Sequence, residues 1–241
     1  MSNGLTLAIP SKGRLEEQSR EIFAAAGLVI ERASNSRSYF GTAARLPDLS
    51  IRFMPAGDIA RELIRGGIDL GVTGQDLIEE SSEDSEVSVL TVRSLGFGQA
   101  DVVIAVPDPW IDVTQIVDLA DVAADFRSRH GRWLRVATKY IDLTRRHFAQ
   151  HGIIEYRVVE SNGATEAAPA TGSADFIVDI TSSGSTLTAN GLRVLEDGVI
   201  MKSEAKLFVS RTAEWTPMRK AQLEALMSVL NWVPPGITTR L

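Results

Sequence analysis

The residues best suited to chemistry form a hydroxyl-rich run at positions 181–186, directly after an apolar stretch at 175–180. The run reads Thr-Ser-Ser-Gly-Ser-Thr, so several hydroxyls and backbone N–H groups surround one glycine. Such a loop can direct several donors at one point, and a helix that starts after it adds partial positive charge there. Asp179 lies near the end of the apolar stretch, where a carboxylate can accept hydrogen bonds from sugar hydroxyls. The pattern favours an anionic sugar phosphate as ligand, and an ordinary turn with a Ser/Thr cap is the alternative.

Two basic residues, Lys12 and Arg14, follow an apolar run at residues 5–9 and precede a helical pattern at 15–26. Cations are unfavourable beside a helix N-terminus unless an anion is bound there. The pair therefore suggests an anion site, with a solvated surface turn as the alternative. Arg37 stands in the middle of a polar stretch, where the residues alone favour an ordinary loop arginine.

Glycines at 71 and 74 line a turn after a strand pattern, so the backbone there can approach a ligand closely. Their spacing does not match the dinucleotide fingerprint, and the chain has no Walker A sequence. His147 and His151 have a spacing that suits two metal ligands, but a third ligand and the glutamate of the zinc motif are missing. We therefore favour two surface histidines over a metal site.

The elements that must position these residues alternate between strand and helix patterns. Strand patterns are short, apolar and rich in β-branched residues, and the helix patterns repeat their apolar residues every three to four positions. This alternation predicts an α/β protein with mainly parallel sheets. We expect strands at 194–200 and 205–210 to pair with each other, and a helix at the end of the chain to cover the core.

Composition limits the classes of function. The chain has 241 residues, 44% hydrophobic content and a net charge of −6, with no long basic run, which argues against nucleic acid as the main partner. It has no cysteine for disulfides or thiolate metal sites. No export leader and no apolar run near the ~20 residues of a membrane span are visible, so we expect a cytoplasmic location and no membrane contact.

Several blocks, in the right order along residues 5 to 210, resemble the ATP phosphoribosyltransferase family. They are Ser-Lys-Gly-Arg at 11–14, Asp-Leu-Gly-Val-Thr-Gly at 69–74, Ala-Thr-Lys-Tyr at 137–140, Asn-Gly-Ala-Thr-Glu at 162–166 and Asp-Ile-Thr-Ser-Ser-Gly-Ser-Thr-Leu at 179–187. One departure is Ala164, where many members have Ser. One block alone would be weak, but the ordered set makes the resemblance specific.

The resemblance implies a two-lobed fold like that of type II periplasmic binding proteins, with a cleft between the lobes. Lobe I would comprise residues 1–98 and 188–241, and lobe II residues 99–187 with the hydroxyl-rich loop. The chain would be a short-form catalytic subunit without a C-terminal regulatory domain, since few residues follow position 210. The implied partner is a histidyl-tRNA-synthetase-like regulatory subunit. This chain would form a homodimer, and the homodimer would bind that subunit in a hetero-oligomer.

The implied reaction joins ATP to phosphoribosyl diphosphate (PRPP) and releases pyrophosphate, with Mg²⁺ bound through the substrate phosphates and no metal ligands from the protein. Catalysis would rest on positioning and electrostatics rather than a covalent nucleophile. The resemblance assigns catalytic roles to Arg14, Arg37 and Lys12. It assigns PRPP binding to Glu166, Asp179, Thr181, Ser182, Ser183, Gly184, Ser185 and Thr186. It assigns ATP binding to Lys12, Arg14, Arg52, Gly71, Thr73 and Asp76.

Three other functions stay open at this stage. A non-catalytic solute-binding protein would share the fold, although such proteins are usually exported. Another class of phosphoribosyltransferase would usually carry two adjacent acids before the loop, whereas Ile180 follows Asp179 here. A pure interaction subunit would tolerate the loss of Lys12, Arg14 and the loop.

Overall fold

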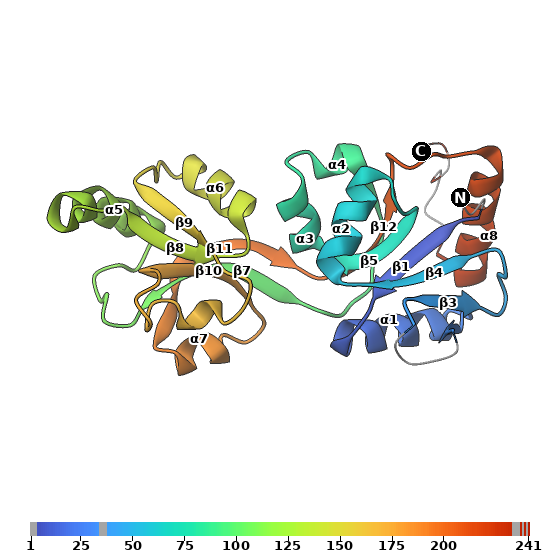
Figure 1. The fold of residues 1–241 in the computed structure, drawn as a ribbon, viewed down its shortest axis with the longest axis horizontal. Helices are drawn as coiled ribbons and strands as arrows, with labels where there is room; N and C mark the ends of the chain where they lie inside the picture. Colours follow the sequence, from blue (N-terminus) through green and yellow to red (C-terminus); the bar gives the residue numbers. More distant parts are fainter. Residues whose placement is uncertain (1–3, 34–37, 233–236, 238, 240) are drawn as a thin grey trace. The chain divides into compact units, whose positions relative to one another are not determined.

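The computed structural model describes residues 4–33, 38–232, 237, 239 and 241 of the chain. Two compact units are present, one formed by residues 1–98 and 204–241 and the other by residues 99–203. Each unit is built on one β-sheet with helices packed on it (Figure 1). The predicted α/β class with two lobes is confirmed. In the described ranges, no helix combines the length and the apolar character that crossing a membrane requires.

The sheet of the first unit has, in the described residues, the strand order β2-β3-β4-β1-β5-β12-β6. Its centre is parallel, because β1 pairs with β4 on one side and β5 on the other in the same direction. The pairs toward both edges are antiparallel. The strands are β1 (Thr6–Pro10), β2 (Ile30–Arg32), β3 (Phe40–Ala43), β4 (Ser50–Met54), β5 (Leu70–Gly74), β6 (Val89–Ser94) and β12 (Ala205–Ser210).

Helices cover both faces of this sheet, and the alternation of side chains along β1 shows how. Leu7 and Ile9 join one core cluster with residues of α1 and α8, whereas Ala8 joins another cluster with residues of α2. Both faces of β1 are therefore buried, as its continuous apolar sequence requires. The helices are α1 (Gly13–Ala25), α2 (Ala56–Arg65), α3 (Gln75–Ser81), α4 (Ser85–Ser88) and α8 (Pro217–Leu230).

The sheet of the second unit has the order β11-β7-β10-β8-β9 in the described residues. β10 lies in its middle, parallel to β8 and antiparallel to β7, and β9 is parallel to β8 (Figure 1). The strands are β7 (Ala100–Pro107), β8 (Leu134–Thr138), β9 (Tyr156–Glu160), β10 (Phe176–Thr181) and β11 (Leu192–Ser203). The helical segments are α5 (Ile116–His130), α6 (Ile141–Gln150), the 3-10 turn η1 (Thr165–Ala167) and α7 (Ser185–Ala189).

The chain returns from the second unit to the first at a later residue than expected. β11 pairs with β7 along most of its length, so the second unit continues to residue 203 instead of ending at 187. The predicted pairing of 194–200 with 205–210 does not occur, because β12 pairs with β5 and β6 in the first unit. Since β7, β11 and β12 all add antiparallel pairs, both sheets are mixed rather than mainly parallel.

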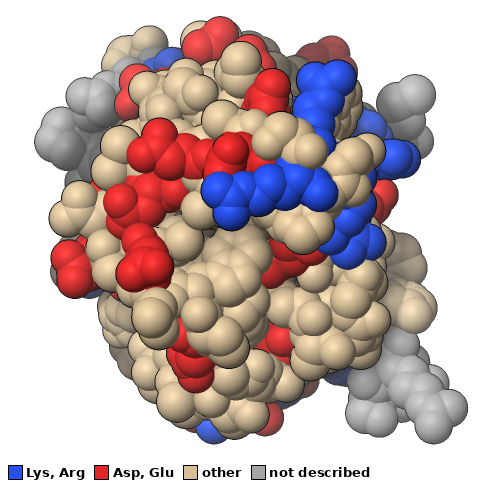
Figure 2. Space-filling view, turned by 90° about the vertical axis from the view of Figure 1, so that its left-hand side faces the viewer, with Lys and Arg blue, Asp and Glu red and all other residues tan. Residues whose placement is uncertain are grey.

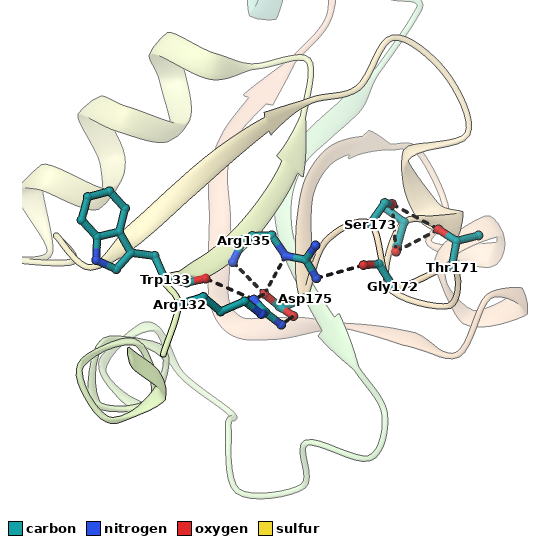
Figure 3. A network of polar contacts seen from close by, with 8 residues as sticks. Arg132, Trp133, Arg135, Thr171, Gly172, Ser173 and Asp175 are labelled. Atoms are coloured by element: carbon teal, nitrogen blue, oxygen red, sulfur yellow. Dashed lines mark hydrogen bonds and ion pairs between the residues drawn. The ribbon is translucent and has the colours of Figure 1, made fainter. Parts of the chain in front are cut away.

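At the start of β10, Asp175 holds together three segments of the second unit (Figure 3). Its carboxylate accepts two hydrogen bonds from the guanidinium of Arg132, at 2.6 and 2.7 Å, and one from the backbone N–H of Arg135 at 2.8 Å. Arg135 also donates to the carbonyl of Gly172 at 2.9 Å. Burial alone would raise the pKa of Asp175, but the hydrogen bonds from the two arginines outweigh it, and the pKa is lowered. Asp175 is therefore a charged structural anchor at neutral pH.

Asp175→Asn is expected to destabilise the chain by about 1–2 kcal/mol at about pH 7, since charge-assisted bonds are lost while Arg132 is partly screened by solvent. Because the folded chain lowers the pKa of Asp175, its stabilisation is full above the pKa of the unfolded chain and is lost as pH falls through the folded-state pKa. Urea unfolding of both proteins at about pH 7 and about pH 3 measures the difference, which should shrink in acid. An equal difference at both pH values would contradict the role of charge.

Candidate functional site

The hydroxyl-rich run forms an exposed bend between β10 and α7. Thr181 ends β10, and its Oγ1 accepts a hydrogen bond of 2.8 Å from the backbone N–H of Gly184. Gly184 has a φ of 74°, a left-handed conformation that glycine adopts without strain. The hydroxyls of Ser183 and Ser185 lie 2.9 Å apart. The bend therefore has an internally bonded shape and carries its hydroxyls at the surface.

The bend also offers backbone donors. The N–H groups of Ser182 and Ser183 have no acceptor in the described part of the chain, and both residues are exposed. The exposed side chain of Thr186, in the first turn of α7, adds a further hydroxyl. Backbone N–H groups that converge in a turn form a concave site for anions, and hydroxyls extend it. The six predicted residues at 181–186 are thus brought together in an arrangement suited to a phosphate group.

Two carboxylates and one ammonium lie beside this bend. Burial raises the pKa of Asp179, while a 2.8 Å hydrogen bond from the backbone N–H of Ile180 and the charge of Lys139 lower it. The nearby charge of Glu166 raises the same pKa, so the net effect is a raised value. Two acidic side chains close enough to influence each other can share the neighbouring hydroxyls of a ribose, and the ammonium can balance their charge.

The topology explains why these residues meet. Lys139 directly follows β8, Glu166 lies in η1 after β9, and the bend follows β10. These three strands are parallel, so their carboxyl ends share one edge of the sheet, where α/β proteins usually bind ligands. Lys139 is missing from the predicted site residues, although its position at a junction of strand and helix is visible in the sequence. Its Nζ lies 4.8 Å from the centre of the Tyr140 ring.

In the first unit, Lys12 and Arg14 lie on the turn that joins β1 to α1. Lys12 is the N-cap of α1 with an extended backbone, and Gly13 follows with a φ of 71°. Both basic side chains are exposed, and the described residues give neither of them a hydrogen bond or an ion pair. Two cations without partners at the start of a 13-residue helix leave the turn ready to bind an anion.

Three further residues predicted to bind ATP have side chains that lie inside the first unit, wholly or in part. The hydroxyl of Thr73 is fully buried and donates to the carbonyl of Ala56 at 2.8 Å, which fixes the start of α2. The Nε of Arg52 is buried without a hydrogen-bond partner, and its charge acts on the buried Asp69. Asp76, in the first turn of α3, is only 5% exposed. These positions are suited to supporting the sheet.

Gly71 is explained by packing between β5 and α2. A Cβ at this position would lie 2.4 Å from Cγ2 of Ile59 and 3.1 Å from Cδ1 of Leu63. The first distance is far below van der Waals contact, so only glycine lets α2 approach the strand this closely. The expected close approach at Gly71 is therefore to a helix of the same unit.

Gly71→Ala is expected to destabilise the chain by about 1–3 kcal/mol, the usual cost of an extra methyl in a packed core. Gly57→Ala is the matched control, because Gly57 lies in α2 and a Cβ there would meet only Arg61 at 3.7 Å. That control should stabilise the chain by about 0.5–1 kcal/mol through helix propensity. Urea unfolding measures both changes, and a neutral Gly71→Ala variant would show that the packing argument fails.

The remaining predicted site residue, Arg37, lies outside the described residues. The described ranges contain no group of three or more His, Cys, Asp or Glu side chains that could hold a metal ion. The rings of His147 and His151 lie with their centres 4.4 Å apart and their planes tilted by 41°, and burial lowers the pKa of His147.

A cavity of about 350 Å³ lies elsewhere in the second unit, between the segment after β7 and α5. Trp110 and Phe126 line it together with Asp125 and Arg129, which pair with each other. Figure 2 shows the side of the second unit that carries α5, with basic and acidic side chains gathered in separate groups. None of the predicted site residues lines this cavity.

Comparison with known proteins gives consistent similarities. A family model described as "HisG: ATP phosphoribosyltransferase" matches residues 55–231. Proteins named ATP phosphoribosyltransferase from Nitrobacter winogradskyi and from a strain of Rhodopseudomonas palustris are 56% and 54% identical to this chain over 216 residues, 90% of this chain and 66% of each relative. One from Bradyrhizobium diazoefficiens is 50% identical over 94% of this chain and 70% of its own length. The chain thus spans about two thirds of the length of these relatives.

Two solved structures show the same arrangement of elements. The structure described as "ATP phosphoribosyl transferase (HisG:HisZ) complex from Thermotoga maritima" aligns with a TM-score of 0.70 and 26% identity, over 94% of this chain and 96% of that one. The substrate-binding protein of an amino acid ABC transporter aligns with a TM-score of 0.51 at 12% identity, over 95% of this chain and 92% of the other. The second similarity shows the fold alone, and it agrees with the predicted type II binding-protein architecture.

Proposed function

This chain belongs to the ATP phosphoribosyltransferase family, and from that membership we propose that it joins ATP to PRPP, giving N1-(5-phosphoribosyl)-ATP and pyrophosphate in the first step of histidine biosynthesis. The observation that carries the proposal is the family match over residues 55–231, which includes the bend after β10. Such a role in amino acid supply favours the cytoplasm as its location.

We assign PRPP to the second unit. The 5-phosphate accepts hydrogen bonds from the free N–H groups of Ser182 and Ser183 and from the hydroxyls of the bend, Thr181, Ser185 and Thr186 among them. Gly184 keeps the bend open to the phosphate, because its left-handed backbone carries no side chain. Asp179 and Glu166 accept hydrogen bonds from the ribose hydroxyls. The electrostatic influence of Glu166 on Asp179 supports a shared role.

We assign the polyphosphate groups to the first unit. Lys12 and Arg14 are exposed cations to which the described residues give no partner, so they can bind diphosphate oxygens without breaking any contact seen there. Arg37 is proposed to assist pyrophosphate departure. Arg52, Gly71, Thr73 and Asp76 shape the surrounding unit, where Gly71 and Thr73 act through packing and the position of α2.

The chemistry then needs positioning and charge stabilisation. Adenine N1 of ATP attacks the anomeric carbon as the bond to pyrophosphate breaks, so positive charge grows on the sugar and negative charge on the leaving group. The cations of the turn stabilise the leaving group, and the carboxylates that hold the ribose hydroxyls orient the sugar. Mg²⁺ bound to the diphosphate supplies further charge neutralisation.

We also propose a regulatory partner. The similar Thermotoga maritima structure is described as a HisG:HisZ complex, which supports a histidyl-tRNA-synthetase-like subunit as the partner of this chain. We further propose that this chain forms a homodimer within that hetero-oligomer. Size-exclusion chromatography with light scattering, on the chain alone and mixed with such a subunit, tests both statements.

The proposed reaction is tested by mixing the protein with ATP, PRPP and Mg²⁺, with and without the synthetase-like subunit, and measuring released pyrophosphate. Product formation requiring both substrates is the expected result. Binding of a small molecule with no pyrophosphate release under either condition would favour a solute-binding protein instead. The fold likeness to a transporter protein makes that outcome the relevant alternative.

A further inference from the structure

Arg32, the last residue of β2, makes an unusually complete set of contacts inside the first unit. Its Nη2 donates to the carbonyl of Ser11 at 2.7 Å, and its Nη1 donates to the carbonyl of Ser38 at 2.8 Å. Its Nε donates to Oε1 of Glu16 at 3.2 Å, and Nη2 lies 3.0 Å from the same oxygen. Its guanidinium lies 3.9 Å from the centre of the Phe53 ring. One side chain thus connects α1 and β4 with the segment after β1 and the segment before β3.

The contact with Ser11 matters because Ser11 directly precedes the basic turn. The backbone N–H of Ser11 donates to the carbonyl of Met54 at 2.9 Å, and its carbonyl accepts from Arg32. The residue before Lys12 is therefore held from both sides, by β4 and by β2. Glu16, in the first turn of α1 after Arg14, is held by the same guanidinium. Arg32 therefore contacts the chain on both sides of the turn that carries the two cations, at Ser11 before it and at Glu16 after it.

The chemistry of arginine suits this task. A planar guanidinium can donate in several fixed directions while its face stacks on an aromatic ring, which a lysine cannot do. The charge of Arg32 is balanced by Glu16, and the two side chains are only 14% and 16% exposed. Arg32 is therefore engaged with the protein, unlike the exposed Lys12 and Arg14.

We propose that Arg32 is a positioning residue that fixes the backbone of the Ser11–Arg14 turn, so that Lys12 and Arg14 meet the departing diphosphate in a productive geometry. This inference rests on the proposed function for its kinetic consequence. The structural statement, that Arg32 holds the backbone of the turn in place, depends only on hydrogen bonds within the first unit. Arg32 itself does not touch the substrate in this proposal.

The test is a double-mutant cycle between Arg32 and Arg14, measured as the turnover number for pyrophosphate release. Arg32→Met should lower turnover roughly 10- to 100-fold, the scale on which a small misplacement of catalytic groups acts. In an Arg14→Ala background the same substitution should cost much less, because the group that it positions is already absent. Arg32→Lys should lower turnover about as much as Arg32→Met, although it keeps the positive charge. It replaces Arg32→Met in the cycle if the methionine variant folds poorly.

Arg20→Met is the matched control. Arg20 also pairs with Glu16, at 3.9 Å, but it does not contact Ser11, and its side chain is 44% exposed. Its turnover should stay near that of the wild type. An equal loss from Arg32→Met in both the wild-type and the Arg14→Ala backgrounds would overturn the proposal, as would a loss from Arg20→Met as large as that from Arg32→Met.

Hydrogen exchange separates this inference from the proposed function. The backbone amide of Ser11, which donates to the carbonyl of Met54, should exchange faster in Arg32→Met and Arg32→Lys than in the wild type, with exchange in the second unit unchanged. A wild-type protein that releases no pyrophosphate would refute the proposed reaction, and the exchange data would still decide whether Arg32 fastens the turn. Unchanged exchange of the Ser11 amide in both variants would overturn the inference whatever the activity.

Discussion

Arg14→Ala is expected to lower the turnover number about 100-fold, the scale of losing one electrostatic contact to a transition state. The physical reason is the exposed guanidinium at the start of α1, which the described residues leave without an ion pair. Negative charge grows on pyrophosphate as the bond to the sugar breaks, so a cation there lowers the barrier more than it strengthens ground-state binding. The absorbance of the product N1-(5-phosphoribosyl)-ATP measures the rate.

Stability and a neighbouring arginine provide the controls for this prediction. Arg14 is exposed and has no ion pair in the described part of the chain, so its removal should change the urea midpoint as little as other surface substitutions do. Arg20→Ala removes another exposed arginine of α1 and should leave turnover unchanged. Arg14→Lys should recover part of the rate, since it keeps the charge without the planar fork. A turnover of Arg14→Ala equal to that of the wild type would refute the assignment.

The parts of the fold and site that sequence could predict are those with local signals. The apolar run of β10, the hydroxyls after it and the glycine at 184 are adjacent in sequence, so their strand and bend are readable without knowing any partner. The same holds for Lys12 and Arg14, which stand between a strand pattern and a helix pattern. Lys139 stands at a junction of the same kind, between β8 and α6, so its place near the site is also readable from the sequence.

The parts that sequence could not predict depend on contacts between distant residues. β12 has an ordinary strand pattern, and nothing local indicates that it pairs with β5 rather than with β11. The hydroxyl of Thr73 donates to a carbonyl 17 positions away, a contact that its neighbours in sequence do not indicate. The role of Arg32 could not be predicted for the same reason, because its hydrogen bond to Ser11 joins residues 21 positions apart. Pairing and positioning are tertiary properties that local pattern underdetermines.

Asp179→Ala is expected to weaken PRPP binding roughly 10- to 100-fold while ATP binding changes little, the scale for losing hydrogen bonds to a charged group. The carboxylate lies near the end of β10 beside Glu166 and the bend, where the ribose hydroxyls are assigned. Calorimetric titration with each substrate separately measures the two affinities. Equal losses for both substrates would refute the assignment of Asp179 to the ribose.

Two acids near opposite ends of β10, Asp175 just before it and Asp179 within it, make this prediction sharper, because they should respond in opposite ways to the same substitution. The folded chain raises the pKa of Asp179, chiefly through burial. Its ionisation therefore lowers stability as pH rises from the pKa of the unfolded chain through the folded-state pKa, and the loss is complete above that value. Asp179→Asn should therefore keep or increase the urea midpoint at about pH 7 while PRPP affinity falls. Asp175→Asn should lower the midpoint and leave PRPP affinity unchanged, since that acid is bound to Arg132 and Arg135 at the opposite end of the strand. A fall in both stability and PRPP affinity for each variant would mean that Asp179 supports the fold rather than the ribose.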